Sequence, residues 1–543
     1  MKKRIAVLLA VIAGLTIGLV QPAEAKVKLP ALVADGMVLQ HSQNINIWGW
    51  ADPGEEVTIT FIKKKYKAVA SPQGQWNITI PATKPGGPHQ MTINNITLSN
   101  ILVGDVFLCS GQSNMELTIA RVMDMFAKEV NEYTNNHIRY IKIPLDYAFD
   151  QPRTDTKPAT WNALEPESVM QFSALCYFFG KEWNQKHGVP VGLINSAVGG
   201  SPVEAWISEE ALKPFPKYLN QRDMYTSNEL NAVIRQAEQQ RTARWNEVLH
   251  NTDPGLHASP NWYHPQYNDE HWPTVDLLDT HWSNNGLNAV NGSYWFRRNF
   301  HVTKELAQQQ ATLRLGCIVD ADFVYVNGQL VGTTAYQYPP RIYHIPAGLL
   351  HEGSNQITIR LISHSGRAHF VPEKPYKLII ADQEIPLQNQ WKQQTGAPMP
   401  PAPPTTTLQY QPVGLYNAMI APIQNYTVAG TMWYQGESNT DRHNEYADLL
   451  TALIADWRAQ RNQPNMPFVV VELASFGHPG NQYMQNQWED LRKAQRHVAN
   501  TVPHTALAPA KDLGEWNDIH PLDKKTVAKR IAAAMEQLIE RNN

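Results

Sequence analysis

The sequence predicts an α/β protein in which a parallel-sheet domain is split by an inserted all-β domain and preceded by a small β-sandwich. Three observations lead to this fold class. Residues 105–109, 170–188 and 189–200 follow the order strand, helix, strand, which is typical of a parallel βαβ unit. Short alternating strands occupy residues 260–395, and strands alternate with helices again after residue 410.

The first 25 residues have the pattern of a secretory signal peptide. Lys2, Lys3 and Arg4 precede an apolar stretch over residues 5–20, and Ala-Glu-Ala at 23–25 forms a small-residue cleavage site. Two glycines interrupt the apolar stretch, so we expect cleavage rather than a retained anchor. No later segment has the uncharged length that a membrane-spanning helix requires. These features predict a periplasmic or secreted protein without a membrane span.

Residues 26–100 are predicted to form the small β-sandwich, of immunoglobulin-like type. INIWGWADPGEEVTITF at 45–61 alternates apolar and polar residues around a central turn, and GQWNITI at 74–80 repeats the pattern. The first part of the α/β domain follows over residues 101–213. Apolar residues recur at helical spacing within 170–188, and Gly188 is expected to end that helix.

Residues 214–259 are polar and helix-prone, and they are predicted to form a helical connector. Residues 260–395 are predicted to be a jelly-roll-like domain, similar to galactose-binding modules, with a hairpin at Asn327-Gly328. The proline-rich segment 396–409 is expected to be an extended linker. The second part of the α/β domain is predicted over 410–543. Its expected elements are strands at 429–435 and 467–473 and helices near 443–460 and 523–540.

Composition excludes several classes of protein. The 46 basic and 49 acidic residues are interspersed and give a net charge of −3, which does not fit a nucleic-acid binder. Three cysteines, Cys109, Cys176 and Cys317, are too few for a disulfide framework and lack the spacing of metal ligands. A Cys109–Cys176 bridge is conceivable in an oxidising compartment, but we expect buried thiols. We expect neither a metal nor a cofactor.

Four polar corners carry the candidate chemistry. In VGDVFLCSGQSNMEL, residues 103–117, a buried strand runs directly into Ser113, where open α/β sheets place their sites. A serine nucleophile needs a base, an acid that orients the base, and donors for the oxyanion. Three further corners could supply these groups: NSAVGGSPVEAW at 195–206, WYQGESNT at 433–440 and EWNDIHP at 515–521.

These blocks carry a family resemblance. GQSNM at 111–115, GGSPVEAW at 199–206, WYQGESN at 433–439 and DIHP at 518–521 stand in the order of the SGNH hydrolase blocks. Together they resemble the sialate O-acetylesterase group of carbohydrate esterases. The resemblance implies a three-layer, flavodoxin-like hydrolase domain with Ser113 as nucleophile and His520 as base.

The resemblance also implies an oxyanion hole, made by the backbone N–H of Ser113, by that of Gly199 or Gly200, and by a side chain of the third block. Because Ser438 stands where the superfamily has asparagine, Gln435 or Asn439 is expected to provide that side chain.

The acid that orients the base is less well defined by the sequence. The superfamily has aspartate three residues before the histidine, where this chain has Asn517. Asp518 is therefore the expected acid, with Asp512 or no acid as alternatives, and Asp518 could instead only cap the last helix. Glu204 and Glu437 are expected to brace loops rather than to take part in catalysis.

The implied function is that of an exported serine esterase that removes O-acetyl groups from carbohydrates, with sialic acids as the first substrate. Acetylated xylan or xyloglucan is the alternative, because the same motifs serve both. An alternative of another class is a carbohydrate-binding protein whose hydrolase domain has lost activity. The inserted domain is expected either to wall the sugar site or to act only as a spacer.

Overall fold

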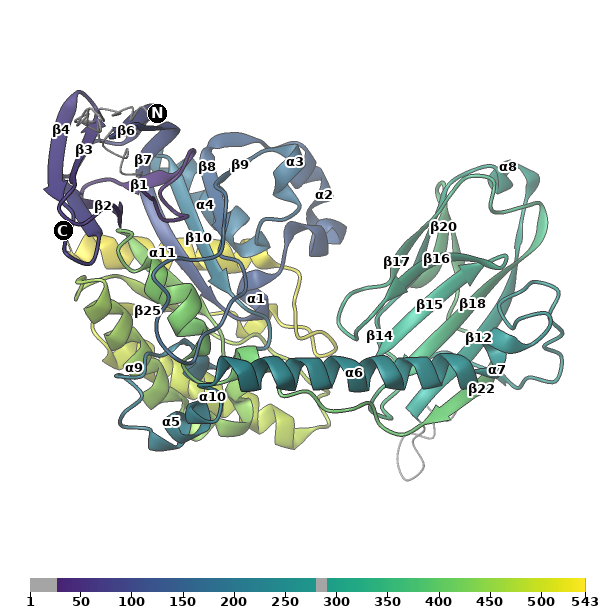
Figure 1. Ribbon diagram of the computed structural model, residues 1–543. Coiled ribbons are helices and arrows are strands. Elements are labelled where there is room, and N and C mark those ends of the chain that lie inside the picture. Colours follow the sequence, from purple (N-terminus) through teal and green to yellow (C-terminus); the bar gives the residue numbers. More distant parts are fainter. Residues whose placement is uncertain (1–26, 280–290, 543) are drawn as a thin grey trace, which may run out of the picture.

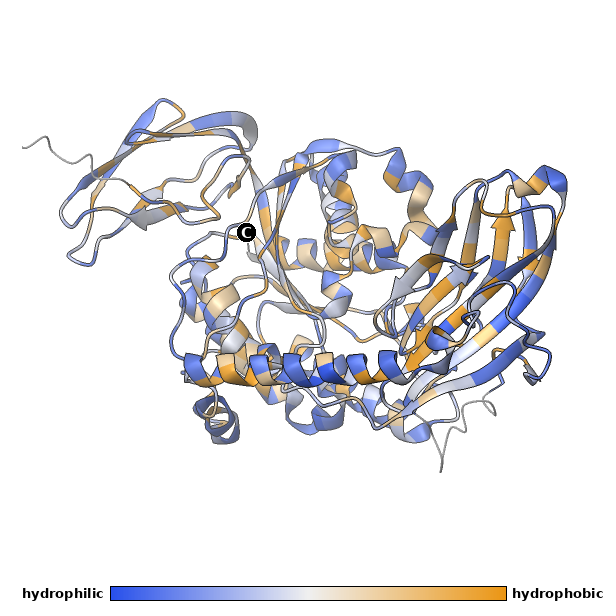
Figure 2. Cartoon of the chain, turned by 45° about the vertical axis from the view of Figure 1, so that its right-hand side comes forward, coloured by the Kyte–Doolittle hydropathy of each residue, from blue (hydrophilic) through white to orange (hydrophobic). Residues whose placement is uncertain are grey.

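The computed structural model describes residues 27–279 and 291–542, so the predicted signal peptide lies outside the described residues. A β module at the amino end, a central α/β domain and a second β domain follow one another across the molecule (Figure 1). Figure 2 shows the hydrophobic residues concentrated in the strands and helices of the two larger parts. No helix within these ranges is long and apolar enough to cross a membrane.

The amino-terminal module consists of two small sheets. One has the order β1-β7-β6-β3-β4 and the other pairs β2 with β5. The strands are β1 (Val38–Gln40), β2 (Ile45–Trp50), β3 (Glu56–Phe61), β4 (Lys64–Val69), β5 (Gln75–Ile80), β6 (Gly86–Ile93) and β7 (Ile96–Gly111).

Strand β7 belongs to two domains at once. Its first half pairs with β1 and β6, and its second half pairs with the central strands β10 (Val191–Ala197) and β23 (Gly430–Tyr434). The boundary that the sequence predicts at residue 100 therefore falls inside one continuous 16-residue strand. The amino-terminal module and the strand that leads to Ser113 are one structural unit.

The central sheet has the order β25-β24-β23-β7-β10-β8-β9, and every pair in it is parallel except β8–β9. Its other strands are β8 (Asn135–Lys142), β9 (Asn162–Leu164), β24 (Phe468–Val471) and β25 (Thr505–Ala508). Numbered in chain order, the parallel strands lie in the order 2-3-1-4-5-6, which differs from the flavodoxin order 2-1-3-4-5. The reason is that β10, and not β8, pairs along its whole length with β7, from Val191 opposite Asp105 to Ala197 opposite Gly111.

Helices cover both faces of this sheet. Neighbouring residues of a strand point to opposite faces, so Gly430 contacts Met535 of α11 while Trp433 contacts Trp457 of α9. The covering helices are α4 (Ala174–His187) and α11 (Lys524–Asn542) on one face and α9 (Tyr446–Gln460) and α10 (Gln482–Thr501) on the other. Gly188 ends α4 with a left-handed φ of 67°, as predicted. Shorter helices are α1 (Ser113–Glu116), α2 (Met123–Asn131) and α3 (Pro166–Val169).

The connector is dominated by one long helix. It comprises α5 (Pro216–Asp223), α6 (Asn228–Thr252) and α7 (Pro254–His257), and α6 runs from the central domain to the inserted domain (Figure 1). Arg235 near the start of α6 donates to the Tyr147 hydroxyl of the central domain at 3.0 Å. At the other end, Asp253 accepts hydrogen bonds from Arg360 and Trp295 of the inserted domain. The helix is thus fixed at both ends.

The inserted domain is an all-β structure of two main antiparallel sheets, with the orders β11-β22-β12-β18-β15-β16 and β17-β13-β20-β21. Phe296, Leu313 and Leu361 belong to the apolar core of this domain. Its elements are β11 (Thr274–Val275), β12 (Asn291–Val302), α8 (Lys304–Ala307), β13 (Ala311–Leu315), β14 (Ile318–Val319), β15 (Ala321–Val326), β16 (Gln329–Thr334), β17 (Ile342–Ile345), β18 (Gly353–Ser363), β19 (His369–Phe370), β20 (Tyr376–Ile380), β21 (Gln383–Pro386) and β22 (Trp391–Met399).

Two details of the insertion bear on the sequence predictions. Asn327 and Gly328 have φ values of 49° and 82° in the turn between β15 and β16, which confirms the predicted hairpin. Strand β22 extends to Met399, so the first residues of the predicted linker belong to the last strand of the insertion.

Candidate active site

Ser113 lies at the point where β7 ends and the single-turn helix α1 begins. Gly111 precedes it with a φ of 134°, and a Cβ at Gly111 would lie 2.1 Å from the carbonyl oxygen of Tyr434. Only glycine fits this approach of the first block to the third, because any side chain would overlap the backbone of β23. The backbone N–H of Gln112 donates to the same carbonyl at 2.9 Å. The strand end is thereby fixed directly in front of Ser113.

The structure brings Ser113 and His520 together although 407 residues separate them. The Oγ of Ser113 lies 2.8 Å from Nε2 of His520, which is 6% exposed in the loop before α11. This is the distance expected for a nucleophile and its general base. Burial is the main cause that lowers the pKa of His520 to about 3, and Lys524 and Arg121 add to it. The imidazole is therefore neutral at pH 7 and able to accept a proton.

Asp518 does not occupy the position that the sequence suggested. Its Oδ1 accepts the backbone N–H of His520 at 2.9 Å, and its Oδ2 lies 3.2 Å from Nζ of Lys374. The spacing explains this difference, because an aspartate side chain bonds readily to the N–H two residues further on. Nδ1 of His520 is buried and has no hydrogen-bond partner among the described residues. Asp518 thus holds the backbone of the base rather than its ring.

The other acids around the site are differently engaged. Both carboxylate oxygens of Asp512 bind Arg530, at 2.6 and 2.7 Å, so the alternative acid is held elsewhere on the surface. Glu437 accepts a 2.6 Å hydrogen bond from Asn114, which is a loop-bracing contact. The second oxygen of Glu437 is buried and, within the described ranges, has no partner, and burial raises the pKa of this carboxyl.

Asn114 joins the blocks next to the nucleophile. Its Nδ2 donates to Glu437 and to the carbonyl of Ile519 at 3.0 Å, and its Oδ1 accepts from the fully buried Lys524 at 2.8 Å. Burial lowers the pKa of Lys524 to about 8. The side chain after the nucleophile thus connects the first block to the third and to the loop of the base.

Among the described residues, the backbone N–H groups of Ser113 and Gly200 are the candidate donors to an oxyanion. The N–H of Gly199 donates to Oε2 of Glu116 at 2.6 Å, so this donor is already engaged. Gly200 has a left-handed φ of 76°, and a Cβ there would overlap the Tyr410 hydroxyl at 2.1 Å. Ser113 is the first residue of α1, so its N–H has no acceptor within the helix. Of the glycines, Gly200 therefore fits the donor role better than Gly199.

The two amide side chains suggested for the third block belong to the loop framework. Gln435 donates to Asn439 at 2.8 Å and to the carbonyl of Ser201 at 3.1 Å, so both its N–H groups are engaged. Asn439 accepts the N–H of Val203 at 3.0 Å and donates to Glu204 at 2.9 Å. Both amides are fully buried. They brace the second block against the third, and Glu204 takes part as a brace.

Two residues contact the site that were not among the residues predicted from the sequence. Gln112 accepts the N–H groups of Gly436 and Ser438 at 3.3 Å and so clamps the third block to the first. The ring of Tyr338, from the loop between β16 and β17, lies edge-to-face with His520 at 5.2 Å and 89°. The Gln112 contact could be suspected from its place beside Ser113. Tyr338 could not, because only tertiary folding brings it near the base.

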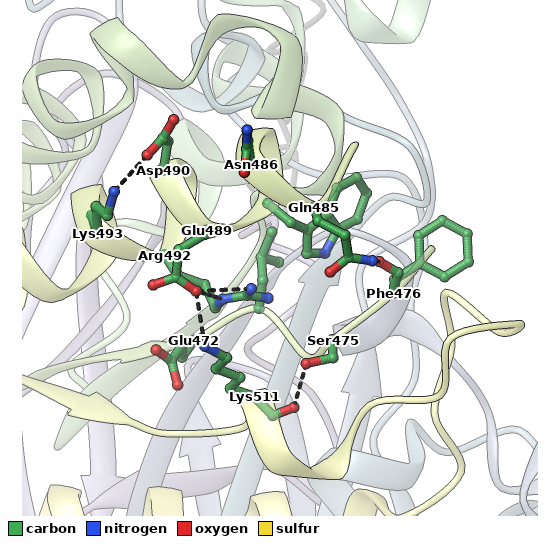
Figure 3. Close-up of polar contacts among 12 residues, drawn as sticks. Glu472, Ser475, Phe476, Gln485, Asn486, Glu489, Asp490, Arg492, Lys493 and Lys511 are labelled. Atoms are coloured by element: carbon green, nitrogen blue, oxygen red, sulfur yellow. Dashed lines mark hydrogen bonds and ion pairs between the residues drawn. The ribbon is translucent and has the colours of Figure 1, made fainter. Parts of the chain in front are cut away.

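The loop after β24 is held by the polar residues of α10 (Figure 3). Gln485 donates to the carbonyls of Phe476 and Gly477, at 3.1 and 2.7 Å. Glu489 binds Arg492 and Lys511, each at 3.0 Å. These contacts tie α10 to the segments that follow β24 and β25, so both segments keep fixed positions at the rim of the sheet.

Comparisons with known proteins agree with this arrangement. Residues 103–247 and 389–537, together more than half of the chain, match the family described as carbohydrate esterase, sialic acid-specific acetylesterase. A sialate O-acetylesterase of Rattus norvegicus is 23% identical over 91% of this chain and 70% of that protein. The sialate O-acetylesterase of Homo sapiens is 30% identical over 37% of this chain and 44% of that protein.

One solved structure has a similar fold. A carbohydrate acetylesterase from Xanthomonas citri superposes with a TM-score of 0.56 at 23% identity, covering 95% of this chain and 76% of that one. Its likeness extends over the α/β parts and the insertion. The family match covers the α/β parts that contribute Ser113, Gly200 and His520. The chain therefore belongs to the sialic acid-specific acetylesterase family of carbohydrate esterases, and it is a carboxylic ester hydrolase.

Proposed function

We propose that this chain is an exported serine esterase that removes O-acetyl groups from carbohydrates through an acyl-Ser113 intermediate. The observation that carries the proposal is the 2.8 Å contact between Ser113 and His520 at the carboxyl end of β7. Strand order reverses on the two sides of β7, since β10 flanks it on one side and β23 on the other. Open α/β sheets bind ligands at such a point. Export rests on the signal-like pattern at the amino end.

In the proposed catalytic cycle, the reacting and stabilising groups are Ser113, His520 and two backbone N–H groups. His520 accepts the Ser113 proton as Oγ attacks the acetyl carbonyl, and the N–H groups of Ser113 and Gly200 stabilise the oxyanion. The C–O bond to the sugar then breaks, and the proton passes from His520 to the departing sugar hydroxyl. Water, activated by His520, hydrolyses the acyl-serine and releases acetate. The low pKa of His520 keeps it ready as a base over a wide pH range.

Sialic acids are the proposed substrates, because the aligned relatives are sialate O-acetylesterases. The decisive experiment measures acetate released from O-acetylated sialoglycans and from acetylated xylo-oligosaccharides by the purified protein. We expect the sialoglycans to react faster. Faster release from the xylo-oligosaccharides would overturn the substrate, and no release from either, with aryl acetates also inert, would overturn the esterase.

The inserted domain is proposed to form one wall of the sugar site. A cavity of about 280 Å³ lies between the insertion and the second part of the α/β domain, beside Asp518. Tyr338 and His369 line it from the insertion, and Phe476, His478 and Trp516 line it from the other side. Aromatic faces with polar neighbours suit a sugar ring.

His478 offers a test of this wall, because it is exposed and lines the cavity. For His478→Ala we expect a higher KM on the acetylated glycan and unchanged hydrolysis of an aryl acetate. The same selective rise in KM is expected for His369→Ala, which changes the insertion side of the cavity, and equal retention of both activities in His369→Ala would leave the insertion as a spacer.

A further inference from the structure

The segment before the base is tied to the inserted domain by a row of side-chain contacts, here named the base-loop strap. It joins residues 515–518 of the α/β domain to residues 372–374 of the insertion. Every residue of the first segment takes part. Trp516 donates to Glu373 at 2.9 Å, Asn517 donates to the carbonyl of Pro372 at 2.7 Å, and Lys374 lies 2.8 Å from Glu515 and 3.2 Å from Asp518.

Lys374 is the central residue of the strap. Its side chain is 13% exposed and that of Asp518 is 11% exposed, so the pair is largely shielded from water. Burial lowers the pKa of Lys374, but Asp518 and Glu515 outweigh it and raise the pKa above its usual value. The lysine therefore carries its charge at neutral pH. A shielded pair of this kind is costly to break, because the partner that is left has neither water nor a counter-charge.

The strap continues to the base through a single carboxylate. Oδ2 of Asp518 faces Lys374, while Oδ1 accepts the backbone N–H of His520. The ring of His520 has no acceptor on Nδ1 within the described part of the chain, so no acid sets its orientation there. Besides the contact of Nε2 with Ser113, the ring packs edge-to-face against Tyr338, which also comes from the insertion. The Tyr338 contact thus comes directly from the insertion, and the Asp518 carboxylate that holds the backbone N–H of His520 is itself paired with Lys374 of the insertion.

We propose that the inserted domain positions the catalytic base, with Lys374 as a positioning residue that acts through Asp518. The inference rests on the proposed function and gives the insertion a role beyond that of a wall or a spacer. In a Ser–His–Asp triad an acid holds the imidazole through Nδ1. Here the backbone of His520 is held by the strap and its ring by Tyr338. The base is ready for Ser113 only when the insertion is docked.

The test compares Lys374→Met with Lys374→Arg in the full chain, using an aryl acetate that has no sugar to bind. For Lys374→Met we expect kcat to fall about 10- to 100-fold, because the base loses its position, while KM stays unchanged. Lys374→Arg keeps the charge and is expected to restore most of the activity. Lys377→Met is the matched control, since Lys377 forms an ion pair with Glu384 of the same domain, at 2.6 Å.

A titration separates positioning from a merely structural effect. Asp518 without Lys374 is an uncompensated negative charge beside the base, which favours the imidazolium. The pKa of His520 is thus expected to rise in Lys374→Met, and the acid limb of kcat/KM to move to higher pH. The charged and titratable groups around His520 are Asp518, Lys524, Arg121, Tyr338, Glu437 and Ser113.

Histidine-labelled NMR follows the same titration without any substrate, with His520→Ala to assign the signal. Unchanged kcat and an unchanged His520 titration in folded Lys374→Met would overturn the strap, as would an equal loss in Lys377→Met. If the wild type hydrolyses no ester, the proposed function fails on its own, and the NMR titration still decides whether Lys374 controls His520.

Discussion

Two serine–histidine contacts lie along strand β7. Beside the middle of the strand, Ser42 Oγ lies 2.6 Å from Nδ1 of His41, and Nε2 of His41 lies 2.8 Å from Asp105. At the carboxyl end, Ser113 contacts His520, and no acid among the described residues binds the imidazole. The first arrangement has all three members of a triad and the second has two.

Ser42, His41 and Asp105 belong to a hydrogen-bond network centred on Asp105. Asp105 accepts from His41, from Trp183 at 2.8 Å and from Gln40 at 3.2 Å. Burial raises the pKa of Asp105, but hydrogen bonds from His41 and Trp183 outweigh it and hold the pKa below its usual value. These bonds fix the middle of β7 to the β1–β2 segment and to α4. A satisfied network of this kind stabilises a fold.

The Ser113–His520 pair differs, because Nδ1 of His520 has no hydrogen-bond partner in the described part of the chain. His520 is buried, its pKa is lowered to about 3, and Gly199 lies next to Ser113. Buried polar groups normally have hydrogen-bond partners, and exceptions are expected at functional sites, where the group must interact with a ligand or substrate. The comparison teaches that a complete serine–histidine–aspartate chain is weaker support for catalysis than position at the strand end and the presence of oxyanion donors.

The largest expected effect tests this contrast directly. Ser113→Ala should lower kcat/KM on an aryl acetate by about 10⁴- to 10⁶-fold, because the nucleophile is removed. Ser42→Ala should stay within about twofold of the wild type, since such exposed substitutions change little. A fluorophosphonate should label the wild type at Ser113 alone, as read by peptide mass spectrometry. Labelling at Ser42 would break the comparison, and an inert Ser113 in folded protein would favour a carbohydrate-binding role.

Asp105→Ala should act on stability rather than on chemistry. Loss of the buried carboxylate leaves His41 and Trp183 without their acceptor, and it should cost about 3 kcal/mol of unfolding free energy. The urea midpoint and the kcat of the folded fraction measure the two effects separately. A fall in kcat at an unchanged urea midpoint would contradict the structural role of the Asp105 network.

Arg121→Gln should move the pH profile. Arg121 is one of the cations that lower the pKa of His520, so its removal should raise that pKa. A base must be neutral to accept the Ser113 proton, and activity is lost as pH falls through its pKa. The acid limb of kcat/KM should therefore shift upward by up to about one pH unit. A downward shift would show that another group controls the limb.

Asp512→Asn is the smallest expected change. Both oxygens of Asp512 bind Arg530 on an exposed surface, so kcat and KM should match the wild type in steady-state assays. A large loss of kcat would instead identify Asp512 as the acid of the site. Asp518→Asn is the useful partner measurement, because Asp518 does contact the backbone of the base.

The sequence predicts the parts of the site that are local. Ser113 and His520 each stand in a short block, one at the end of a strand and one before a helix, and the structure brings these two residues together. The sequence predicts that Asp518 orients the ring of His520, whereas the structure shows it bound to the backbone N–H of His520. The two-residue spacing suits such a side chain-to-backbone turn. The expected donor Gln435 is engaged within its own loop framework, which spacing alone does not reveal.

The strand order of the central sheet and the contacts of the insertion with the base depend on residues that are far apart in the sequence. Whether β8 or β10 lies beside β7 is decided by contacts across the sheet, and no local pattern distinguishes them. Tyr338 and Lys374 reach the base from a domain inserted between two halves of the chain. Their own segments carry turn and loop residues without any periodic signal, so their role becomes visible only in three dimensions.

The continuity of β7 constrains how this architecture can change during evolution. The insertion enters and leaves the α/β domain through a helix and an extended segment, and such modules can be lost or exchanged as units. The amino-terminal module has no such freedom, because its sheet and the strand before Ser113 are one piece of chain. A lineage that discards this module would have to rebuild the first strand of its catalytic sheet, so the two should be inherited together.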